Sequence, residues 1–147
     1  IYISTLYSVL YNKKFLNIEG FQQYMPRKKI GEFSTKIIKT LNLDIPAGTP
    51  IYIAESNIEH MKSSHPKDFD KYGNDIETII ASPDYVGQNT KDSSIEFTKE
   101  YLMNGDHVKV AVRVSLHNTY YARSLYILNP NRVKNFIAKG TLRKLDK

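Results

Sequence analysis

The chain of 147 residues is long enough for one domain with a buried core, and its 41% hydrophobic and 24% charged residues exclude a disordered chain. Its net charge of +6 favours a polyanionic partner such as nucleic acid. The absence of cysteine excludes a disulfide framework, a thiolate metal site and a cysteine nucleophile, and no apolar run approaches the ~18 residues that a membrane span needs, so we expect no membrane partner.

The N-terminal part of the chain is expected to lie outside the main domain. Residues 1–18 carry apolar side chains at helical spacing, which predicts a helix. Residues 19–33 contain the breakers Gly20, Pro26 and Gly31 and a basic run at 27–29, which predicts a linker. We therefore expect an N-terminal helix and lead-in over residues 1–29 and the main domain over residues 30–147. Because the chain starts at Ile1, we expect it to be a piece of a longer polypeptide.

The next segment predicts helices around one short strand. Ser34 is a suitable N-cap for a helix that runs to about Leu43. Residues 51–54 form a short β-branched run typical of a strand. Ser56 is expected to cap the following helix, and Pro66 is expected to open another one.

Two further helices frame the remaining strands. Ile76, Ile79 and Ile80 form the apolar face of the first, which ends at Ser82-Pro83. The second begins at Asn129-Pro130 and ends at Gly140. Helices before and after a run of strands predict an α+β fold with an antiparallel β-meander sheet.

The meander itself lies between Ser93 and Tyr126, where three β-prone runs are separated by turn signals. Asn104-Gly105 predicts a two-residue hairpin loop. The register that follows places these facing pairs on the core side: Ile95–Val114, Phe97–Val112, Lys99–Val110 and Tyr101–Val108. On the opposite, polar side it pairs Glu96 with Arg113, Thr98 with Ala111 and Glu100 with Lys109.

The expected pair of Glu96 and Arg113 has two interpretations. It is either a solvated cross-strand ion pair that contributes roughly 0.2 to 1 kcal/mol, or part of a functional site. The stretch alone leaves both open.

The second turn, near His117-Asn118, allows two registers for the third strand. A two-residue loop places Arg113 opposite Ala122 and puts Ser124 and Tyr126 on the polar side, but it forces Arg123 into the core. A three-residue loop places Arg113 opposite Arg123 and turns Ser124 inward. Burial of an unpaired arginine is costly, which favours the three-residue loop, and both registers stay open.

The four histidines differ in position. His107 and His117 lie about 20 Å and 13 Å along the strand from Arg113, too far to share one phosphate with it. His60 and His65 lie between the short strand and the next helix, where a chain reversal can bring both toward the sheet. They do not have the HExxH spacing of a metal motif, so we predict no metal site. Capping or packing is the alternative explanation for each of them.

Five segments in order resemble a known class of nucleases: IYIAESNIEHMKSSHP, IIASPDYVG, SIEF, VKVAVRV and YYARSLYIL. Together they are similar to the phage-associated nuclease domains of the barnase, EndoU, colicin and RelE-like class (the BECR fold), from about Ile30 to Leu145. The resemblance implies a compact ribonuclease, often a toxin, with helices packed on one sheet face, an active site on the other and no metal or cofactor. By position it implies these catalytic residues: His60, His65, Glu96, Arg113, Arg123 and Ser124. Thr98, Lys109 and Tyr126 are the expected substrate contacts.

These residue types suit the transesterification of RNA. A base removes the proton of a ribose 2′-hydroxyl, which attacks the adjacent phosphate, and an acid protonates the departing 5′-oxygen. Glu96 or one histidine is the expected base, and the other histidine is the expected acid. Arg113 and Arg123 are expected to hold the phosphate, with Ser124 and Tyr126 orienting it.

Three functions follow as hypotheses. The first is a metal-independent endoribonuclease that acts on RNA as a toxin or mobile-element effector, with an acidic inhibitor as its partner. We expect it in the cytoplasm, including the cytoplasm of a target cell to which a larger protein delivers it. The second is a non-catalytic nucleic-acid-binding module, and the third is a structural phage or mobile-element protein.

Overall fold

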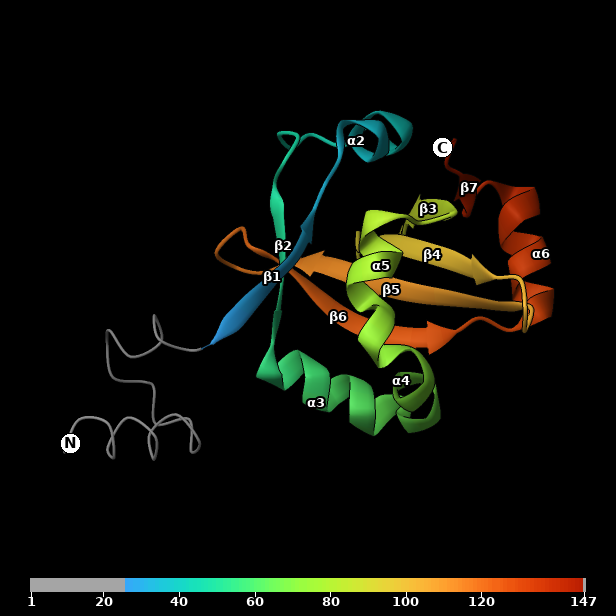
Figure 1. Cartoon of the computed structure of the whole chain (residues 1–147). Helices are drawn as coiled ribbons and strands as arrows, with labels where there is room; N and C mark the ends of the chain where they lie inside the picture. Colours follow the sequence, from blue (N-terminus) through green and yellow to red (C-terminus); the bar gives the residue numbers. More distant parts are fainter. Residues whose placement is uncertain (1–25, 147) are drawn as a thin grey trace.

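The computed structural model describes residues 26–146, so the helix predicted over residues 1–18 lies outside the described residues. Within this part of the chain, seven strands form one sheet in the order β1-β2-β6-β5-β4-β3-β7 (Figure 1). Neighbouring strands are antiparallel except β2 and β6, which are parallel. The strands are β1 (Arg27–Glu32), β2 (Pro50–Ala54), β3 (Tyr85–Gln88), β4 (Ile95–Tyr101), β5 (Asp106–Val114), β6 (Tyr120–Ile127) and β7 (Arg143–Lys144).

The helices of the described chain lie before and after the meander, as predicted. They are α2 (Thr35–Leu41), α3 (Glu55–Ser64), α4 (Pro66–Tyr72), the 3-10 helix η2 (Gly73–Asp75), α5 (Ile76–Ala81) and α6 (Pro130–Lys139). The prediction of an α+β fold with a mainly antiparallel sheet is confirmed. No helix within residues 26–146 is long and apolar enough to cross a lipid bilayer.

Strand β1 is a correction to the sequence analysis, which predicted a linker here. Its basic residues suit the edge of a sheet, where charges discourage further strand pairing. Ile30 turns inward and is buried. A Cβ on Gly31 would lie 2.7 Å from Ile80 Cγ2, so this glycine allows α5 to pack closely against β1. The expected boundary between residues 29 and 30 falls inside this strand.

Three of the four predicted helix starts are confirmed, among them that of α6 at Asn129-Pro130. The Ser34 hydroxyl accepts a 3.2 Å hydrogen bond from the N–H of Ile37, and Pro66 opens α4. The prediction that Ser56 caps α3 is wrong. The helix starts one residue after Ala54, whose N–H donates to Asn57 Oδ1 at 2.9 Å. The side-chain acceptor that tethers this helix start therefore lies inside the first turn.

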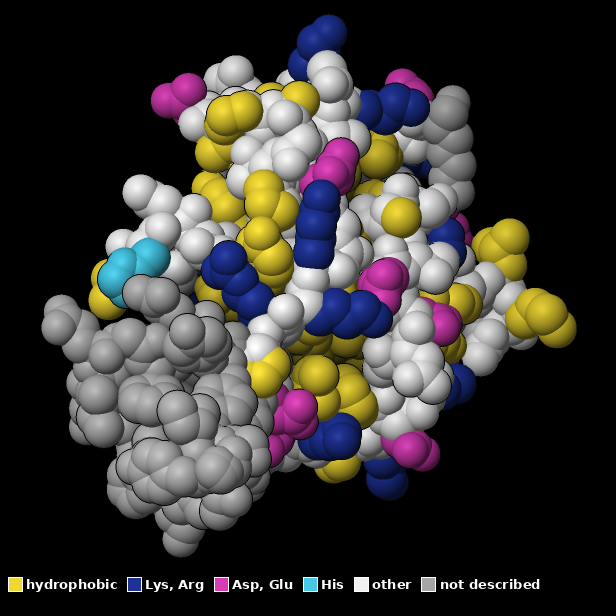
Figure 2. Space-filling model, turned by 60° about the vertical axis from the view of Figure 1, so that its left-hand side comes forward, with side chains coloured by type: hydrophobic (Ala, Val, Ile, Leu, Met, Phe, Trp, Pro, Cys, Tyr) yellow, Lys and Arg dark blue, Asp and Glu magenta, His cyan; other side chains and the backbone are white. Residues whose placement is uncertain are grey.

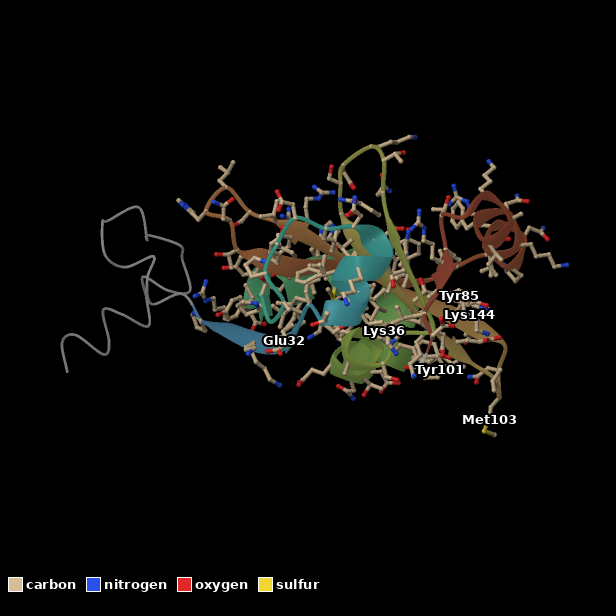
Figure 3. The ribbon with its side chains drawn as sticks, turned by 90° about the horizontal axis from the view of Figure 1, so that it is seen from above. Glu32, Lys36, Tyr85, Tyr101, Met103 and Lys144 are labelled. Carbon is tan, nitrogen blue, oxygen red and sulfur yellow. The ribbon has the colours of Figure 1, made fainter. Side chains whose placement is uncertain are left out.

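The main core lies between one face of the sheet and α5, with α2 and α4 beside it (Figure 1). Inward side chains of the sheet and of α5 form its centre: Phe97, Val110, Val112, Leu125, Ile76, Ile79 and Ile80. A smaller cluster packs α6 against the opposite face at one end of the sheet, around Leu128, Val133 and Leu142. In Figure 3, α5 and α6 lie on opposite sides of the sheet. The rest of that second face is open for a binding site.

The β4–β5 hairpin keeps its predicted faces but not its predicted partners. Phe97 faces Val110 and Thr98 faces Lys109, a shift of two residues from the expected register. The shift arises because the turn contains Leu102–Gly105 rather than two residues, with the N–H of Gly105 donating to the carbonyl of Tyr101 at 2.8 Å. Since side chains alternate along a strand, a slip of two residues returns each to its own face. The expected pairing of Glu96 with Arg113 is wrong, because Glu96 faces Ala111.

The β5–β6 pair follows neither predicted register along its whole length. Ala111 faces Ser124, as a two-residue loop would give, but Val112 faces Ala122, so Arg123 is an extra residue in a β-bulge. Ala122 and Leu125 are both buried in the core, which places Arg123 and Ser124 together on the other face. The bulge thus exposes Arg123 and keeps Ser124 on the same side. The three-residue loop favoured on grounds of arginine burial is wrong.

Candidate active site

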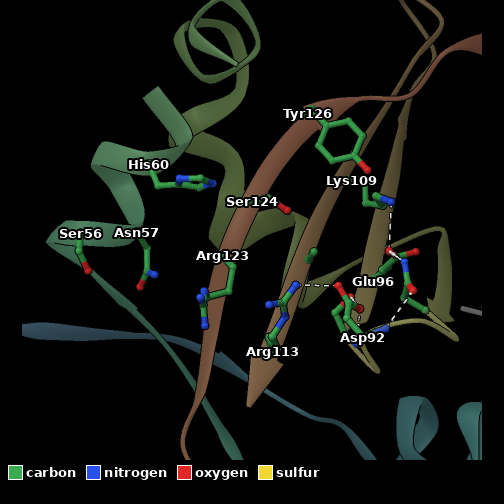
Figure 4. Close-up of a pocket in the computed structure, with 13 residues that line it drawn as sticks. Ser56, Asn57, His60, Asp92, Glu96, Lys109, Arg113, Arg123, Ser124 and Tyr126 are labelled. Carbon is green, nitrogen blue, oxygen red and sulfur yellow. Dashed lines mark hydrogen bonds and ion pairs between the residues drawn. The ribbon is translucent and has the colours of Figure 1, made fainter. Parts of the chain in front are cut away.

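The open part of the second sheet face contains a pocket of about 460 Å³, here called the central pocket (Figure 4). Strands β4, β5 and β6 form its floor, the N-terminal half of α3 forms one wall, and the loop of residues 89–94 forms another. It gathers most of the polar residues singled out in the sequence. The lining residues are Ser56, Asn57, His60, Asn89, Asp92, Ser94, Glu96, Lys109, Ala111, Arg113, Arg123, Ser124 and Tyr126.

Glu96 and Lys109 form an ion pair at the floor of the central pocket. Lys109 Nζ lies 3.1 Å from Glu96 Oε2, with 8% and 7% of the two side chains exposed. Asn89 Nδ2 donates a longer hydrogen bond, 3.4 Å, to the same oxygen. Burial alone lowers the pKa of Lys109, but Tyr126 and the carboxylate of Glu96 outweigh it, so this pKa lies above its ordinary value. The lysine is therefore a fixed positive charge beneath the pocket.

Arg113 is held by the 89–94 loop rather than by Glu96. Its Nη2 lies 2.6 Å from Asp92 Oδ2. The other carboxylate oxygen of Asp92 accepts hydrogen bonds from the N–H and the hydroxyl of Ser94, and Asn89 Oδ1 accepts from the N–H of Asp92 at 3.3 Å. The bonds from Ser94, and then Arg113, hold the pKa of Asp92 below its ordinary value. Asp92 is thus an anionic clamp that orients Arg113 at the rim.

His60 and Arg123 line the central pocket from two different elements, α3 and β6. His60 lies on the second turn of α3, exposed, with Nε2 3.3 Å from Ser64 Oγ one turn later. Helix α3 packs against β6, so the ring lies on the pocket side of that strand (Figure 4). The bulge points Arg123 outward from β6 beside Ser124. An imidazole, two carboxylates, one ammonium and two guanidinium groups therefore surround one cavity.

A pocket of this composition can bind a phosphodiester, and the comparison with protein families agrees. Residues 28–135 match the family described as phage-Barnase-EndoU-ColicinE5/D-RelE like nuclease3. The chain belongs to this nuclease family. The match begins within β1 and covers every strand and helix that lines the central pocket. No curated protein and no solved structure matches the chain.

Two of the predicted site residues, His65 and Thr98, do not line the central pocket. Thr98 lies on the pocket side of β4, opposite Lys109, but it is completely buried and does not line the cavity. His65 joins α3 to α4 and stacks on Tyr126, with ring centres 4.9 Å apart. Thr98 is therefore removed from the expected substrate contacts, and His65 touches the site through Tyr126.

The other two histidines lie away from the central pocket, as expected. His107 Nε2 is 3.7 Å from Glu100 Oε2, at the far end of the β4–β5 hairpin. His117 is exposed in the β5–β6 turn and lines a different pocket. Among residues 26–146, no group of three or more His, Asp or Glu side chains could hold a metal ion.

Sequence reasoning missed the acidic and amide side chains of the pocket walls. Asp92 and Asn89 lie in the polar segment QNTKDSS, which carries an Asn-based turn signal: Asn89 Oδ1 accepts the N–H of Lys91 at 2.8 Å. That signal could have predicted the turn. It could not have predicted that the turn folds over Arg113, because this contact depends on the pairing of β3 with β4. Ser56 and Asn57 became wall residues through the packing of α3 on β6.

Proposed function

We propose that this protein is a metal-independent endoribonuclease that cleaves RNA by attack of a ribose 2′-hydroxyl on the adjacent phosphate. One observation carries the proposal: a single cavity of about 460 Å³ is lined by the carboxylate of Glu96, the imidazole of His60 and the guanidinium groups of Arg113 and Arg123. A carboxylate and an imidazole supply the two proton transfers that this reaction needs, and the cations supply stabilisation of the phosphate.

In the proposed reaction, Glu96 is the base. Its Oε2 accepts from Lys109 and Asn89, which leaves Oε1 as the oxygen to receive the proton of the 2′-hydroxyl. His60 is the acid, because an imidazole can carry a proton near neutral pH and its exposed position lets it recover one from water. The 2′-oxygen forms a bond to phosphorus, the bond to the 5′-oxygen breaks, and His60 protonates that oxygen. The products are a 2′,3′-cyclic phosphate and a 5′-hydroxyl.

The cations have distinct proposed roles. Arg113, held by Asp92 at 2.6 Å, and Arg123, placed by the bulge, bind the phosphate oxygens from two strands. Lys109 lies under Glu96 and orients its carboxylate. The hydroxyl groups of Ser124 and Tyr126 complete the cradle, with the ring of His65 fixing that of Tyr126.

Cleavage of a fluorescent RNA oligonucleotide in EDTA tests the proposal. We expect fragments ending in 2′,3′-cyclic phosphate, and no cleavage of the same oligonucleotide with 2′-deoxyribose throughout. His60→Ala, Glu96→Gln and Arg113→Ala are each expected to lower the cleavage rate by about 100-fold or more. His107→Asn is the matched control, because this histidine lies outside the pocket. Equal rates for His60→Ala and His107→Asn, both folded, would refute the assignment of the acid.

A second candidate is the nucleic-acid-binding module without catalysis. The observation that favours it is the engagement of the Glu96 carboxylate with Lys109, with only 7% of the glutamate side chain exposed. Such a module would bind RNA with an affinity that falls steeply as the salt concentration rises. It would leave the RNA intact at every protein concentration. The cleavage assay therefore separates the two candidates.

A role as a toxin or phage effector belongs to the same proposal. An inhibitor that covers the central pocket would need acidic side chains to complement Arg113 and Arg123. We expect induced expression of the wild-type chain in bacteria to arrest growth and expression of His60→Ala to leave it unaffected. Equal growth in both cultures would contradict the toxin role without bearing on RNA cleavage in vitro.

A further inference from the structure

A second cavity, here called the outer pocket, adjoins the central pocket on the side of β2 and β1. Its volume is about 700 Å³, and it lies between the start of β1, the end of β2 and the β5–β6 turn. Ser56, Asn57 and Arg123 line both cavities. In Figure 4 Arg123 lies between Arg113 on one side and the α3 residues Ser56 and Asn57 on the other. The two cavities are therefore neighbours that share one guanidinium group.

The outer pocket carries an aromatic surface next to that guanidinium. Tyr121 on β6 lies directly opposite Arg113 on β5. Its ring centre is 6.3 Å from that of Tyr52 on β2. The guanidinium carbon of Arg27 on β1 lies 4.1 Å above the ring of Tyr52, and Nη1 is 3.5 Å from the Tyr121 hydroxyl. Arg27 therefore contacts both tyrosines, and the three side chains form one cluster, of which Arg27 and Tyr121 line the outer pocket. Surfaces of this kind stack nucleobases with little regard to sequence.

The charge of the outer pocket matches a nucleic-acid strand. Among the described residues that line it, none is Asp or Glu, whereas Arg27, Arg123 and His117 are present. The central pocket, in contrast, contains Asp92 and Glu96. Figure 2, which brings the β1 side of the molecule forward, shows Lys and Arg mixed with Asp and Glu over the surface rather than gathered in one patch. The acid-free lining is therefore a local feature.

The far wall of the outer pocket is held in shape by its own hydrogen bonds. Ser115 Oγ accepts from the N–H groups of His117 and Thr119, each at 3.3 Å, and the N–H of Ser115 donates to the carbonyl of Thr119 at 2.7 Å. Asn118 takes the left-handed conformation, with φ of 60°, that closes this turn. A turn fixed in this way offers a preformed surface to a ligand.

From these observations we propose that the outer pocket is a nucleoside subsite. It would take the base and sugar next to the phosphate bound at Arg123, with the base stacked on Tyr121. This inference extends the proposed function: it makes the substrate a single strand with at least one nucleoside beyond the scissile phosphate, because a base can stack here only when it is unpaired.

Two ligands with one phosphate each test the subsite without any cleavage. The dinucleotide d(ApA) has a second nucleoside, whereas 2′-deoxyadenosine 3′-monophosphate has none and carries more negative charge. NMR titration of the backbone amides gives both dissociation constants. We expect d(ApA) to bind about tenfold more tightly or better, with shifts at residues 115–121 that the mononucleotide does not cause. Equal affinities in the wild-type protein would overturn the subsite.

Variants assign the extra affinity to the aromatic surface. Tyr121→Ala is expected to bring the ratio of the two affinities close to one, whereas Tyr121→Phe keeps it, since phenylalanine also stacks bases. Arg27→Met is expected to lower the ratio as well. Because Arg27 is exposed, this substitution leaves the hydrophobic core unchanged. Leu116→Ser is the control, because Leu116 is 98% exposed in the same turn and does not line the pocket. An unchanged ratio in a folded Tyr121→Ala protein, or in Arg27→Met if the alanine variant does not fold, would refute the proposal.

The subsite and the ribonuclease activity fail separately. Both ligands lack the 2′-hydroxyl, so their binding does not depend on catalysis. A protein that shows the Tyr121-dependent ratio but leaves RNA intact would retain the subsite and lose the proposed enzyme. A protein that cleaves RNA but binds both ligands equally would retain the proposed enzyme activity and lose the subsite.

Discussion

Lys109 reaches diagonally across the β4–β5 ladder to Glu96, with Nζ 3.1 Å from Oε2, although the residue directly opposite Lys109 is Thr98. Both charged side chains are more than nine-tenths buried. Charges removed from water in this way depend on each other, because either alone would keep the cost of desolvation without the compensating attraction. The pair therefore couples the stability of the sheet to the chemistry of the pocket.

A double-mutant cycle measures this dependence. Lys109→Met is expected to lower the free energy of unfolding by about 3 kcal/mol, because it leaves the carboxylate of Glu96 without its cation. The double variant Glu96→Gln/Lys109→Met is expected to lose clearly less than the sum of the two single changes. Urea unfolding gives the three values. The exposed pair Lys28–Glu77, at 2.8 Å, is the control, with a coupling below about 1 kcal/mol. Additive losses at Glu96 and Lys109 would contradict the mutual dependence.

The bulge at Arg123 predicts an unusual tolerance to deletion. Removal of Arg123 leaves Ala122 and Ser124 consecutive, opposite Val112 and Ala111, so the ladder becomes regular and every side chain keeps its face. We expect this deletion to change stability by no more than about 1 kcal/mol and to abolish RNA cleavage. Removal of Ala122 instead places Arg123 in the core, which is expected to cost several kcal/mol, on the order of the whole stability of the domain. Thermal unfolding of the two deletion variants tests this difference in stability. Equal unfolding midpoints would contradict the assignment of Arg123 as the extra residue of the bulge.

The contact between Tyr72 and Asp106 predicts how stability depends on pH. The Tyr72 hydroxyl donates a 2.6 Å hydrogen bond to Asp106. Burial, and then this bond, raise the pKa of Tyr72 from 10.0 to about 12, and the same bond helps to hold the pKa of Asp106 below its ordinary value. The stabilisation from Tyr72 is thus present below pH 10 and is lost as the pH rises from about 10 to about 12. That from Asp106 is present above its unfolded value of 3.8 and is lost as the pH falls below it.

Unfolding midpoints measured across pH check both limbs. Tyr72→Phe is expected to flatten the alkaline limb, and Asp106→Asn is expected to flatten the acid limb. Asp70→Asn is the control, because Asp70 is exposed and takes no part in the hydrogen bond between Tyr72 and Asp106. This variant is expected to keep both limbs of the wild-type profile. A wild-type acid limb in Asp106→Asn would contradict the role of this hydrogen bond.

A side chain at Gly87 is expected to disturb the edge of the sheet that is formed by β7. It lies on β3, and a Cβ there would be 2.1 Å from the carbonyl oxygen of Thr141, just before β7. Gly87→Ala is expected to displace β7 and to cost about 1 to 3 kcal/mol. Hydrogen exchange at the N–H of Leu145, which donates to Asp84 at 3.0 Å, would report the displacement. Thr90→Ala, at an exposed loop residue, should leave this exchange rate unchanged.

The faces of the sheet were predictable because they depend only on alternation along each strand. Phe97 and Val110 face the core although the register is two residues away from the predicted one. The exact partners were not predictable, since the length of the β4–β5 turn depends on how Tyr101 and Gly105 bond to each other. The identity of β1 was missed because its charged residues suit a solvated linker as well as they suit an edge strand.

The candidate site was predictable where it lies on the meander and much less so elsewhere. Glu96, Arg113 and Ser124 follow from the polar face of the strands. Each of the two predicted registers placed only one of Arg123 and Ser124 on that face. The bulge places both there. His60 reaches the pocket through the packing of α3 on β6, a contact between distant segments that local patterns do not encode.

The pairing of β2 with β6 has a consequence for synthesis on the ribosome. Helix α3 follows β2 directly, so the wall that carries His60 meets the floor that carries Arg123 only after β6 has left the exit tunnel. A chain arrested before Tyr120 has neither the shared guanidinium nor the strand on which α3 rests. The nascent polypeptide therefore lacks an assembled central pocket until β6, which ends at Ile127, has been translated.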